Sequence, residues 1–431
     1  TNDKYTLVIN DFGEGYSKLK DIYVNKYNDS CHQSNVIYIK NTNDNTFWSS
    51  TLHPTLKEPD EYLIYFSPGE SKFYRRDGDI ETITRISVSP EENVELRQVE
   101  IRNVGESKAS VDVMSYIEPI LSEKNSDIAH PVYNNLFLRA INLDGRVLIE
   151  KRFPNGNKMF FTNFAVCDDQ DVKFEVELDK SKIIGRMKTM ETPEALTENR
   201  MFSNNISPVV NTTIAIKTSV TINENSSVVI NYYYGISTNK DDIGLIIEKF
   251  SRDTADKRLF ELAKSRCLIE NRFVGLKGNE IELYNELLAE ILKGSKSLDK
   301  YKNIIENNQK NQRELWRYGI SGDYPIILVK IKNVNDAYVI KQLVKAIDYF
   351  NIKNIKIDLV IVDEENGNEK YVYSKIIEYI FARNISYLIN SNGGFHIIKA
   401  KDLASGDIEL LFACSDVIFK AEDGFLEEQL E

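Results

Sequence analysis

The side chains best suited to binding a ligand lie in one short segment, Leu315-Trp-Arg-Tyr-Gly-Ile-Ser-Gly-Asp-Tyr-Pro-Ile-Ile-Leu. Trp316 could stack on the face of a sugar ring, and Arg317 or Asp323 could bind hydroxyl or phosphate groups. The same segment could instead be a hinge through which helices enter the next domain, with Trp316 buried as an anchor. Composition alone favours the hinge over the site.

A second candidate is the glycine-containing segment Asp11-Phe-Gly-Glu-Gly-Tyr-Ser17, which follows a strand-like run. A tight loop here could bring backbone amides and Tyr16 close to a sugar. Glycine also supplies the positive φ of a hairpin turn. No helical pattern opens after the segment, so the hairpin turn is the favoured interpretation.

Acidic side chains form a third candidate. Asp358 and Asp363 to Glu365 are expected at the C-terminal end of a buried parallel strand, where open α/β sheets usually bind ligands. A solvated turn before the next helix is the favoured interpretation. The four histidines never occur at metal-ligand spacing, so each, His396 included, is expected to be a packed or surface residue.

Several functional classes are disfavoured by what the sequence lacks. It contains no G-x-x-x-x-G-K-[ST] phosphate loop, no G-x-G-x-x-G after a strand and no G-x-S-x-G elbow, so no cofactor is expected. The net charge of -12 argues against nucleic acid, because phosphate binding needs a basic surface. The cysteines are far apart and are expected to be free thiols of a reducing compartment: Cys31, Cys167, Cys267 and Cys414.

Residues 1–240 have the pattern of a large antiparallel β-sandwich. Short apolar runs alternate with turn signals such as Leu143-Asp-Gly-Arg, and Ile80–Val88 alternates with period two. The Tyr232-Tyr-Tyr run could supply aromatic rings to a carbohydrate, but strand alternation buries at least one of the three. Many evenly spaced strands with little helix between them indicate two packed sheets.

The pattern becomes helical over residues 241–313, which are expected to form a linker, and then α/β over residues 314–431. The runs Ile326–Ile331 and Ile355–Val362 are continuously apolar, as in parallel strands buried on both faces. Ile385–Ile389, Gly394–Lys399 and Asp416–Lys420 are expected to complete the sheet. The predicted fold class is therefore a β-sandwich, a helical linker and a small three-layer α/β domain.

The sequence also bears on location. No stretch approaches the roughly 20 apolar residues of a membrane span, and no signal-peptide pattern is visible at the start. A cytoplasmic protein without membrane insertion by this segment is expected. Both ends resemble cuts within a longer polypeptide, since the chain begins without Met and ends on acidic, helix-like residues.

Strings along nearly the whole chain, in order, resemble one family. They are Gly15-Tyr-Ser-Lys-Leu-Lys-Asp21, Phe47-Trp-Ser-Ser with His53-Pro-Thr55, Ile86-Ser-Val-Ser-Pro-Glu-Glu92, Ser115-Tyr-Ile-Glu118, His130-Pro-Val-Tyr-Asn-Asn-Leu-Phe137, Leu315-Trp-Arg-Tyr-Gly-Ile-Ser-Gly-Asp-Tyr-Pro-Ile326, Asp358-Leu-Val-Ile361 and Gly393-Gly-Phe395. The family contains the cyclic β-1,2-glucan synthases and the 1,2-β-oligoglucan phosphorylases of glycoside hydrolase family 94. The string Cys31-His-Gln-Ser34 departs from it.

The resemblance implies a galactose-mutarotase-like sandwich, linker helices and an α/β insertion. In the family a second sandwich and an (α/α)6 barrel follow, and the barrel holds the general acid and the site for inorganic phosphate, the co-substrate. The resembling segments therefore supply no catalytic residue. Candidate substrate-binding residues in them are Tyr16, Trp48, His130, Trp316, Arg317 and Asp323.

Several functions remain open. The chain could position β-1,2-glucan for a phosphorylase that inverts the anomeric centre, or be the same region of a synthase on the cytoplasmic side of the inner membrane. It could also be a free-standing carbohydrate-binding module, for which Tyr16, Trp48 and Trp316 are the expected contacts. A fourth possibility is that the sandwich mainly forms a homodimer.

Overall fold

The computed structural model describes residues 1–26, 35–169, 172–198, 200–293, 296–365 and 371–430. Cys31 and the string that contains it lie outside the described residues. The chain folds as two compact units, Thr1–Leu268 and Ile269–Glu431. Helices from the predicted linker occur in both units: α5 (Lys240–Phe250) belongs to the first, and α6 (Ala255–Val274) contains the division.

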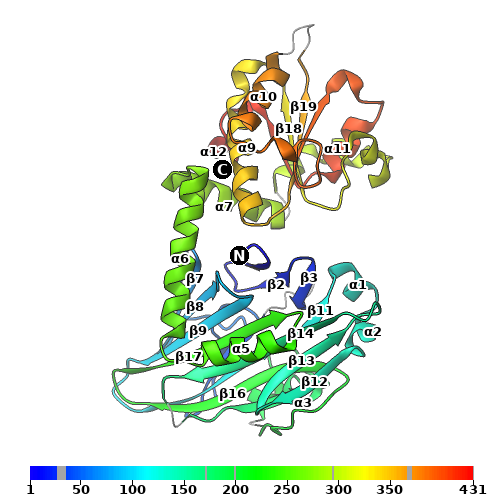
Figure 1. Ribbon diagram of the computed structural model, residues 1–431. Helices are drawn as coiled ribbons and strands as arrows, with labels where there is room; N and C mark the ends of the chain where they lie inside the picture. Colours follow the sequence, from blue (N-terminus) through cyan, green and yellow to red (C-terminus); the bar gives the residue numbers. More distant parts are fainter. Residues whose placement is uncertain (27–34, 170–171, 199, 294–295, 366–370, 431) are drawn as a thin grey trace. The chain divides into compact units, whose positions relative to one another are not determined.

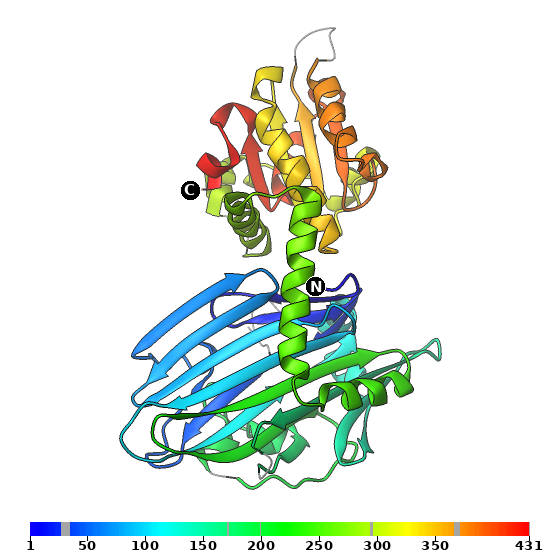
Figure 2. The ribbon, with the colours of Figure 1, turned by 60° about the vertical axis from the view of Figure 1, so that its left-hand side comes forward.

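The described residues of the first unit form three antiparallel sheets (Figures 1 and 2). The largest runs in the order β12 (Leu138–Leu143), β13 (Arg146–Arg152), β14 (Lys158–Cys167), β17 (Ser226–Ser237), β9 (Val94–Asn103), β8 (Ile80–Val88), β7 (Glu70–Asp77) and β6 (Glu61–Ser67). The second runs in the order β15 (Glu175–Asp179), β16 (Thr212–Ile222), β10 (Ala109–Ile117), β4 (Val36–Asn41) and β5 (Phe47–Ser49). The third runs in the order β1 (Tyr5–Ile9), β2 (Gly15–Leu19), β3 (Ile22–Asn25) and β11 (Pro119–Ser122).

Strand alternation divides the buried side chains of the large sheet between two cores. On β17, Tyr232 and Tyr234 face the core between the sheets, whereas Tyr233 faces α5, its ring centroid 5.2 Å from that of Phe250. Figure 1 shows α5 lying against this sheet. All three tyrosines are buried, so the run is part of the structural core and presents no aromatic surface.

Turns and short helices complete the first unit. Asp144 and Gly145 have φ of 50° and 83° between β12 and β13, so the predicted hairpin turn is confirmed. The glycine-containing segment Asp11–Ser17 likewise begins in the turn between β1 and β2, and β2 starts within it at Gly15. The short helices are α1 (Lys124–Ala129), α2 (Pro131–Asn135), α3 (Lys180–Ile183) and α4 (Glu194–Thr197).

The second unit is a parallel sheet covered on both faces. Its order is β20 (Phe395–Lys399), β19 (Asp358–Asp363), β18 (Ile326–Ile331) and β21 (Val417–Lys420). Ile327 and Val329 belong to one core, and Ile326 and Leu328 to the other. The helices are α7 (Gly278–Lys293), α8 (Lys302–Glu306), α9 (Tyr338–Ile352), α10 (Tyr371–Phe381), α11 (Asp407–Cys414) and α12 (Leu426–Leu430). The predicted combination of β-sandwich and α/β architecture is confirmed.

Two local predictions in this unit are wrong. The segment Ile385–Ile389 is not a strand, because it forms a 3-10 turn at Ser386–Leu388 between two left-handed residues, Asn384 and Asn390. Asp358 does not join the acidic cluster at the C-terminal end of β19, because β19 begins at Asp358. Other 3-10 turns are η1 (Lys296–Tyr301), η2 (Gln312–Tyr318), η3 (Val334–Asp336), η5 (Ala400–Asp402) and η6 (Ala421–Asp423).

Candidate functional site

The most promising site lies in the second unit, where η2 leads into β18. The Asn311 side chain accepts a hydrogen bond from Arg313 N at 3.1 Å and thereby caps the start of η2. Gly319 ends η2 in the left-handed conformation, with φ of 73°, which only glycine adopts readily. Leu315 and Ile320, on either side of this turn, are fully buried in the core beneath it. The local sequence therefore fixes the turn that carries Trp316.

A shallow pocket of about 610 Å³ opens beside this turn, and it brings together two of the predicted residues, Trp316 and Asp323. The Trp316 side chain is 62 % exposed, and its Nε1 donates a hydrogen bond to Ser321 O at 3.2 Å. That bond fixes the indole edge and leaves ring surface open to solvent. The remaining lining residues are Gln312, Arg313, Gly319, Ile320, Ser321 and Asn392. Within the second unit Trp316 is exposed, and Leu315 and Ile320, not Trp316, anchor this turn in the core.

Arg317 serves a different set of contacts. Among the described residues, it does not line the pocket, and its guanidinium pairs with Glu314 and, at 3.4 Å, with the fully buried Asp407. Burial would raise the pKa of Asp407, but hydrogen bonds from Lys310 and Tyr318 outweigh it and hold that pKa below its ordinary value. Arg317 therefore helps to hold η2 against α11.

The other predicted residues lie in the first unit on three separate elements. Tyr16 on β2 is half-buried, with its ring centroid 5.0 Å from that of Tyr23. Trp48 on β5 is 1 % exposed and belongs to the sandwich core, so in this structure its ring is closed to a ligand. His130 is exposed between α1 and α2.

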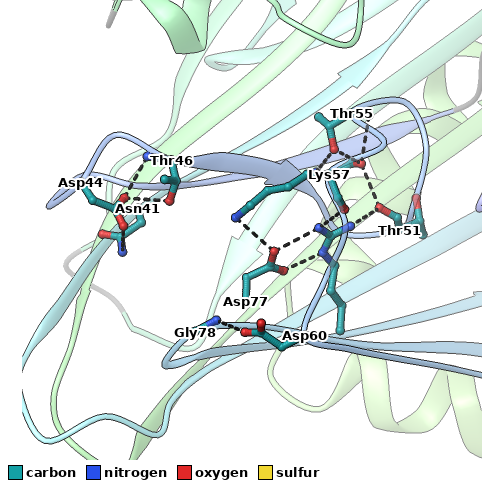
Figure 3. A network of polar contacts seen from close by, with 11 residues as sticks. Asn41, Asp44, Thr46, Thr51, Thr55, Lys57, Asp60, Asp77 and Gly78 are labelled. Atoms are coloured by element: carbon teal, nitrogen blue, oxygen red, sulfur yellow. Dashed lines mark hydrogen bonds and ion pairs between the residues drawn. The ribbon is translucent and has the colours of Figure 1, made fainter.

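Arg75 holds the loop that follows Trp48, in which Figure 3 labels Thr51, Thr55 and Lys57 close to Asp77. Arg75 is fully buried and binds Asp77 with two hydrogen bonds of 2.6 and 3.1 Å. It also donates to Thr51 O at 3.2 Å and to Lys57 O at 2.7 Å. The Lys57 Nζ lies 4.4 Å from the centroid of the Trp48 ring and 3.2 Å from Asp77. These contacts give Trp48 in the Phe47-Trp-Ser-Ser segment a structural role, namely packing beside the loop that Arg75 and Lys57 hold in place.

The same loop meets the turn between β1 and β2. His53 N donates to Phe12 O at 3.1 Å, and His53 Nδ1 lies 2.6 Å from the Glu14 carboxylate. A Cβ on Gly13 would come within 2.3 Å of Thr51, so the close approach of the two segments requires glycine. The string that contains His53 therefore lies next to the turn that precedes the string beginning at Gly15.

Two further properties concern only the residues that the structure describes. They contain no group of three or more His, Cys, Asp or Glu side chains that could hold a metal ion. Within the same residues, no helix combines the length and apolar character needed to cross a membrane. Pocket residues missed by the sequence reasoning are Gln312, Arg313 and Asn392, which no motif spacing connects.

Residues 1–253 match the supersandwich domain of the glycosyl hydrolase 94 family. The chain belongs to this family. The resemblance drawn from the sequence strings is thereby confirmed. The whole of this glycosyl hydrolase 94 chain also aligns, at 21% identity, with the cyclic beta-(1,2)-glucan synthase NdvB of Rhizobium meliloti (strain 1021). It spans 16% of that relative's length.

Solved structures similar to this glycosyl hydrolase 94 chain include a bacterial glucoamylase complexed with acarbose, at 10% identity, a TM-score of 0.35 and coverage of 62% of this chain and 37% of that one. A protein described as a kojibiose phosphorylase from the human microbiome matches at 9% identity and a TM-score of 0.35, with 63% and 32% covered. One described as an aldose 1-epimerase from Escherichia coli K12 matches at 9% identity and a TM-score of 0.29, with 55% and 97% covered.

Proposed function

We propose that this chain is the accessory, substrate-positioning and scaffolding region of a β-1,2-glucan phosphorylase. The parent enzyme cleaves β-1,2-glucosyl linkages with inorganic phosphate and inverts the anomeric centre, and its second β-sandwich and (α/α)6 barrel carry the catalysis. The alignment of the whole chain with a cyclic β-(1,2)-glucan synthase supports β-1,2-glucan as the substrate class. The alternative parent is a membrane-bound synthase, with this region on the cytoplasmic side of the inner membrane rather than free in the cytoplasm.

The observation that carries the glucan-holding role is the pairing of Trp316 with Asp323 in one pocket. Aromatic faces bind the apolar C–H face of a pyranose, while carboxylate and amide groups accept and donate hydrogen bonds to its hydroxyls. Trp316, Asp323 and Asn392 supply these groups along one surface. The proposal assigns Trp316, Asp323 and Asn392 to sugar binding and gives none of them a part in catalysis.

Isothermal titration of the purified chain with β-1,2-gluco-oligosaccharides tests the proposal, with cellobiose as the linkage control. Saturable binding of the β-1,2-linked sugars is expected, weakened at least about tenfold in Trp316→Ala, which corresponds to about 1.4 kcal/mol. Phe381→Ala removes a comparably exposed aromatic ring, 58 % exposed and absent from the pocket lining, and is the matched control. If no oligosaccharide gives saturable heat at concentrations up to about 10 mM, the dissociation constant is too weak for a glucan-holding role, and that role is refuted.

The edge strand β6 favours a second candidate, homodimer formation. Among the described strands, β6 ends the largest sheet, and its run Tyr62–Phe66 carries no charge. Leu63, Tyr65 and Phe66 are 41, 52 and 53 % exposed. The opposite edge, β12, carries the exposed polar residues Arg139 and Asn142. Unprotected apolar edge strands favour pairing with another strand.

Antiparallel pairing of β6 with β6 of a second copy is self-complementary. Centred on Ile64, it places Leu63 opposite Tyr65 and Glu61 opposite Ser67, so no like charges face each other. Light scattering is expected to give twice the chain mass, and Tyr65→Lys to give the monomer. Tyr387→Lys, at another exposed tyrosine, is the control. A wild-type monomer at high concentration would exclude this candidate.

A further inference from the structure

A buried pair of titratable side chains lies beneath the Trp316 pocket. Asp358, at the start of β19, and His396, on β20, are 0 and 1 % exposed, and His396 Nε2 lies 3.3 Å from Asp358 Oδ1. The same carboxylate oxygen accepts a hydrogen bond from Gly393 N at 2.6 Å. Asn392, next to Gly393, lines the pocket. The pair is thus linked to the pocket wall through the backbone.

His396 points toward the layer that contains the pocket. It alternates along β20 with Phe395, which belongs to the opposite core, and shares its strand face with Ile398. Ile398 packs in the same core as Leu315 and Ile320, the residues that anchor the turn of Trp316. A Cβ built on Gly319, which lines the pocket, would lie 4.0 Å from His396 Nδ1. The missing side chain of Gly319 therefore leaves this nitrogen close to the pocket wall.

Within the described part of the chain, His396 Nδ1 has no hydrogen-bond partner, and neither does Asp358 Oδ2. A buried polar atom left without a partner costs about 1–3 kcal/mol, so natural structures rarely retain one without a reason. The Asp358 carboxylate favours the tautomer in which Nε2 carries the proton and donates to it. Nδ1 is then a lone-pair acceptor, and its natural partner is a hydroxyl donor.

We propose that the pocket binds a single neutral pyranose ring and that His396 accepts a hydrogen bond from one of its hydroxyls. The Trp316 indole packs on the ring face, and Asp323 and Asn392 bind hydroxyls at the rim. His396 Nδ1 is buried behind Gly319 in the unliganded chain, so the turn at Gly319 shifts on binding and lets one hydroxyl donate to this nitrogen. Asp358 is a positioning residue that fixes the imidazole. Arg313 and Asp323 offset each other's charge on the lining, which favours a neutral ligand over an anion. The assignment of a glucosyl unit rests on the proposed function.

The first test follows the imidazole in the wild-type chain, so it does not depend on a variant that folds. Nitrogen-15 NMR of His396 is recorded with glucose, methyl β-glucoside, the β-1,2-linked disaccharide and, as controls, galactose and mannose. A saturable change of the Nδ1 resonance, with Nε2 still protonated, is expected for the bound sugar. An Nδ1 resonance unmoved by a sugar that does bind at Trp316 would overturn the proposal.

The second test identifies the hydroxyl. His396→Phe removes the acceptor at similar size and is expected to weaken binding about tenfold, whereas His396→Gln keeps an acceptor and is expected to stay within about threefold of wild type. One member of a monodeoxy-glucoside series should bind wild type and His396→Phe equally, because it lacks the hydroxyl in question. Unchanged tryptophan fluorescence of each free variant, to which Trp48 and Trp316 both contribute, shows that the surroundings of both rings have kept their shape. Equal affinity of His396→Phe and wild type for every sugar would overturn the proposal.

The outcomes separate this inference from the proposed function. Glucan binding that depends on Trp316 but not on His396 removes the inference and leaves the function. Binding of galactose or mannose that depends on His396, without binding of β-1,2-glucan, removes the function and leaves a pyranose site of another specificity. If no sugar binds and the Nδ1 resonance never moves, both are refuted.

Discussion

Replacing Arg75 with methionine is expected to destabilise the first unit strongly. The guanidinium is fully buried and makes four hydrogen bonds, two to Asp77 and one each to the carbonyls of Thr51 and Lys57. Arg75→Met leaves the Asp77 carboxylate, whose side chain is 3 % exposed, with Lys57 as its remaining ion-pair partner. Both carbonyls of the loop after Trp48 also lose a donor.

The magnitude follows from the asymmetry of buried ion pairs. Removing one partner of a buried ion pair costs about 3–5 kcal/mol, because the remaining charge stays in the protein interior with fewer compensating contacts. For a unit of this size the loss corresponds to a fall in Tm of about 10 °C. Removing both charges is much less harmful, so Arg75→Met combined with Asp77→Leu is expected to recover at least about 1–2 kcal/mol of the single-variant loss.

The two tryptophans of the chain provide a clean assay. In a Trp316→Phe background, Trp48 is the single remaining tryptophan, and its 1 % exposure gives blue-shifted emission that moves to the red when the first unit unfolds. Urea titrations then give the free energy of unfolding of each variant. Arg76→Met is the matched control, since it removes the same charge one residue along β7, where Arg76 Nε binds the exposed Gly78 O at 3.0 Å. It is expected to cost less than about 1 kcal/mol.

Two results would refute this reasoning. One is a loss in Arg75→Met no larger than that in Arg76→Met, which would mean that the buried hydrogen bonds contribute little. The other is a double variant no more stable than Arg75→Met, which would mean that the Asp77 charge, left without its Arg75 partner, is not the source of the loss.

Three further predictions concern buried charges and a tight turn. Burial lowers the pKa of Lys151, which is 3 % exposed, to about 8. Raising the pH from 8 to 10.5 is therefore expected to increase the free energy of unfolding by up to about 3 kcal/mol. If the difference in this free energy between wild type and Lys151→Met did not change with pH, the prediction would be contradicted. Because the pKa of Asp407 is held low, the protection factors of the β18 amides, taken relative to the intrinsic exchange rate at each pH, should decrease as the pH falls below about 4, and less so in Asp407→Asn; an equal decrease in both would count against the assigned pairing. Gly69→Ala should lower the free energy of unfolding by about 2 kcal/mol or more, because its Cβ would come within 2.7 Å of the α6 backbone at Ala263. Gly145→Ala, at a left-handed position in open space, should lower it by only about 1 kcal/mol. Equal losses in the two variants would show that α6 shifts to make room for the added methyl group.

Elements with a regular pattern were predictable from the sequence. Period-two alternation and turn residues indicated the strands of the sandwich, and the buried runs Ile326–Ile331 and Ile355–Val362 indicated parallel strands, because these patterns depend on neighbours in the chain. The segment Ile385–Ile389 misled for the same reason: a short apolar run fits a strand or a buried turn equally well.

By itself, the sequence determined the two kinds of architecture, the family and the segment that carries Trp316 and Asp323. Only the tertiary structure decided which aromatic rings are open, since exposure depends on what packs over a side chain: Trp48 is enclosed and Trp316 is not. The tertiary structure alone also placed Asp358 next to His396, which lies 38 residues later. Neighbouring parallel strands are joined by a long crossover, so residues that face each other on them are far apart in the sequence.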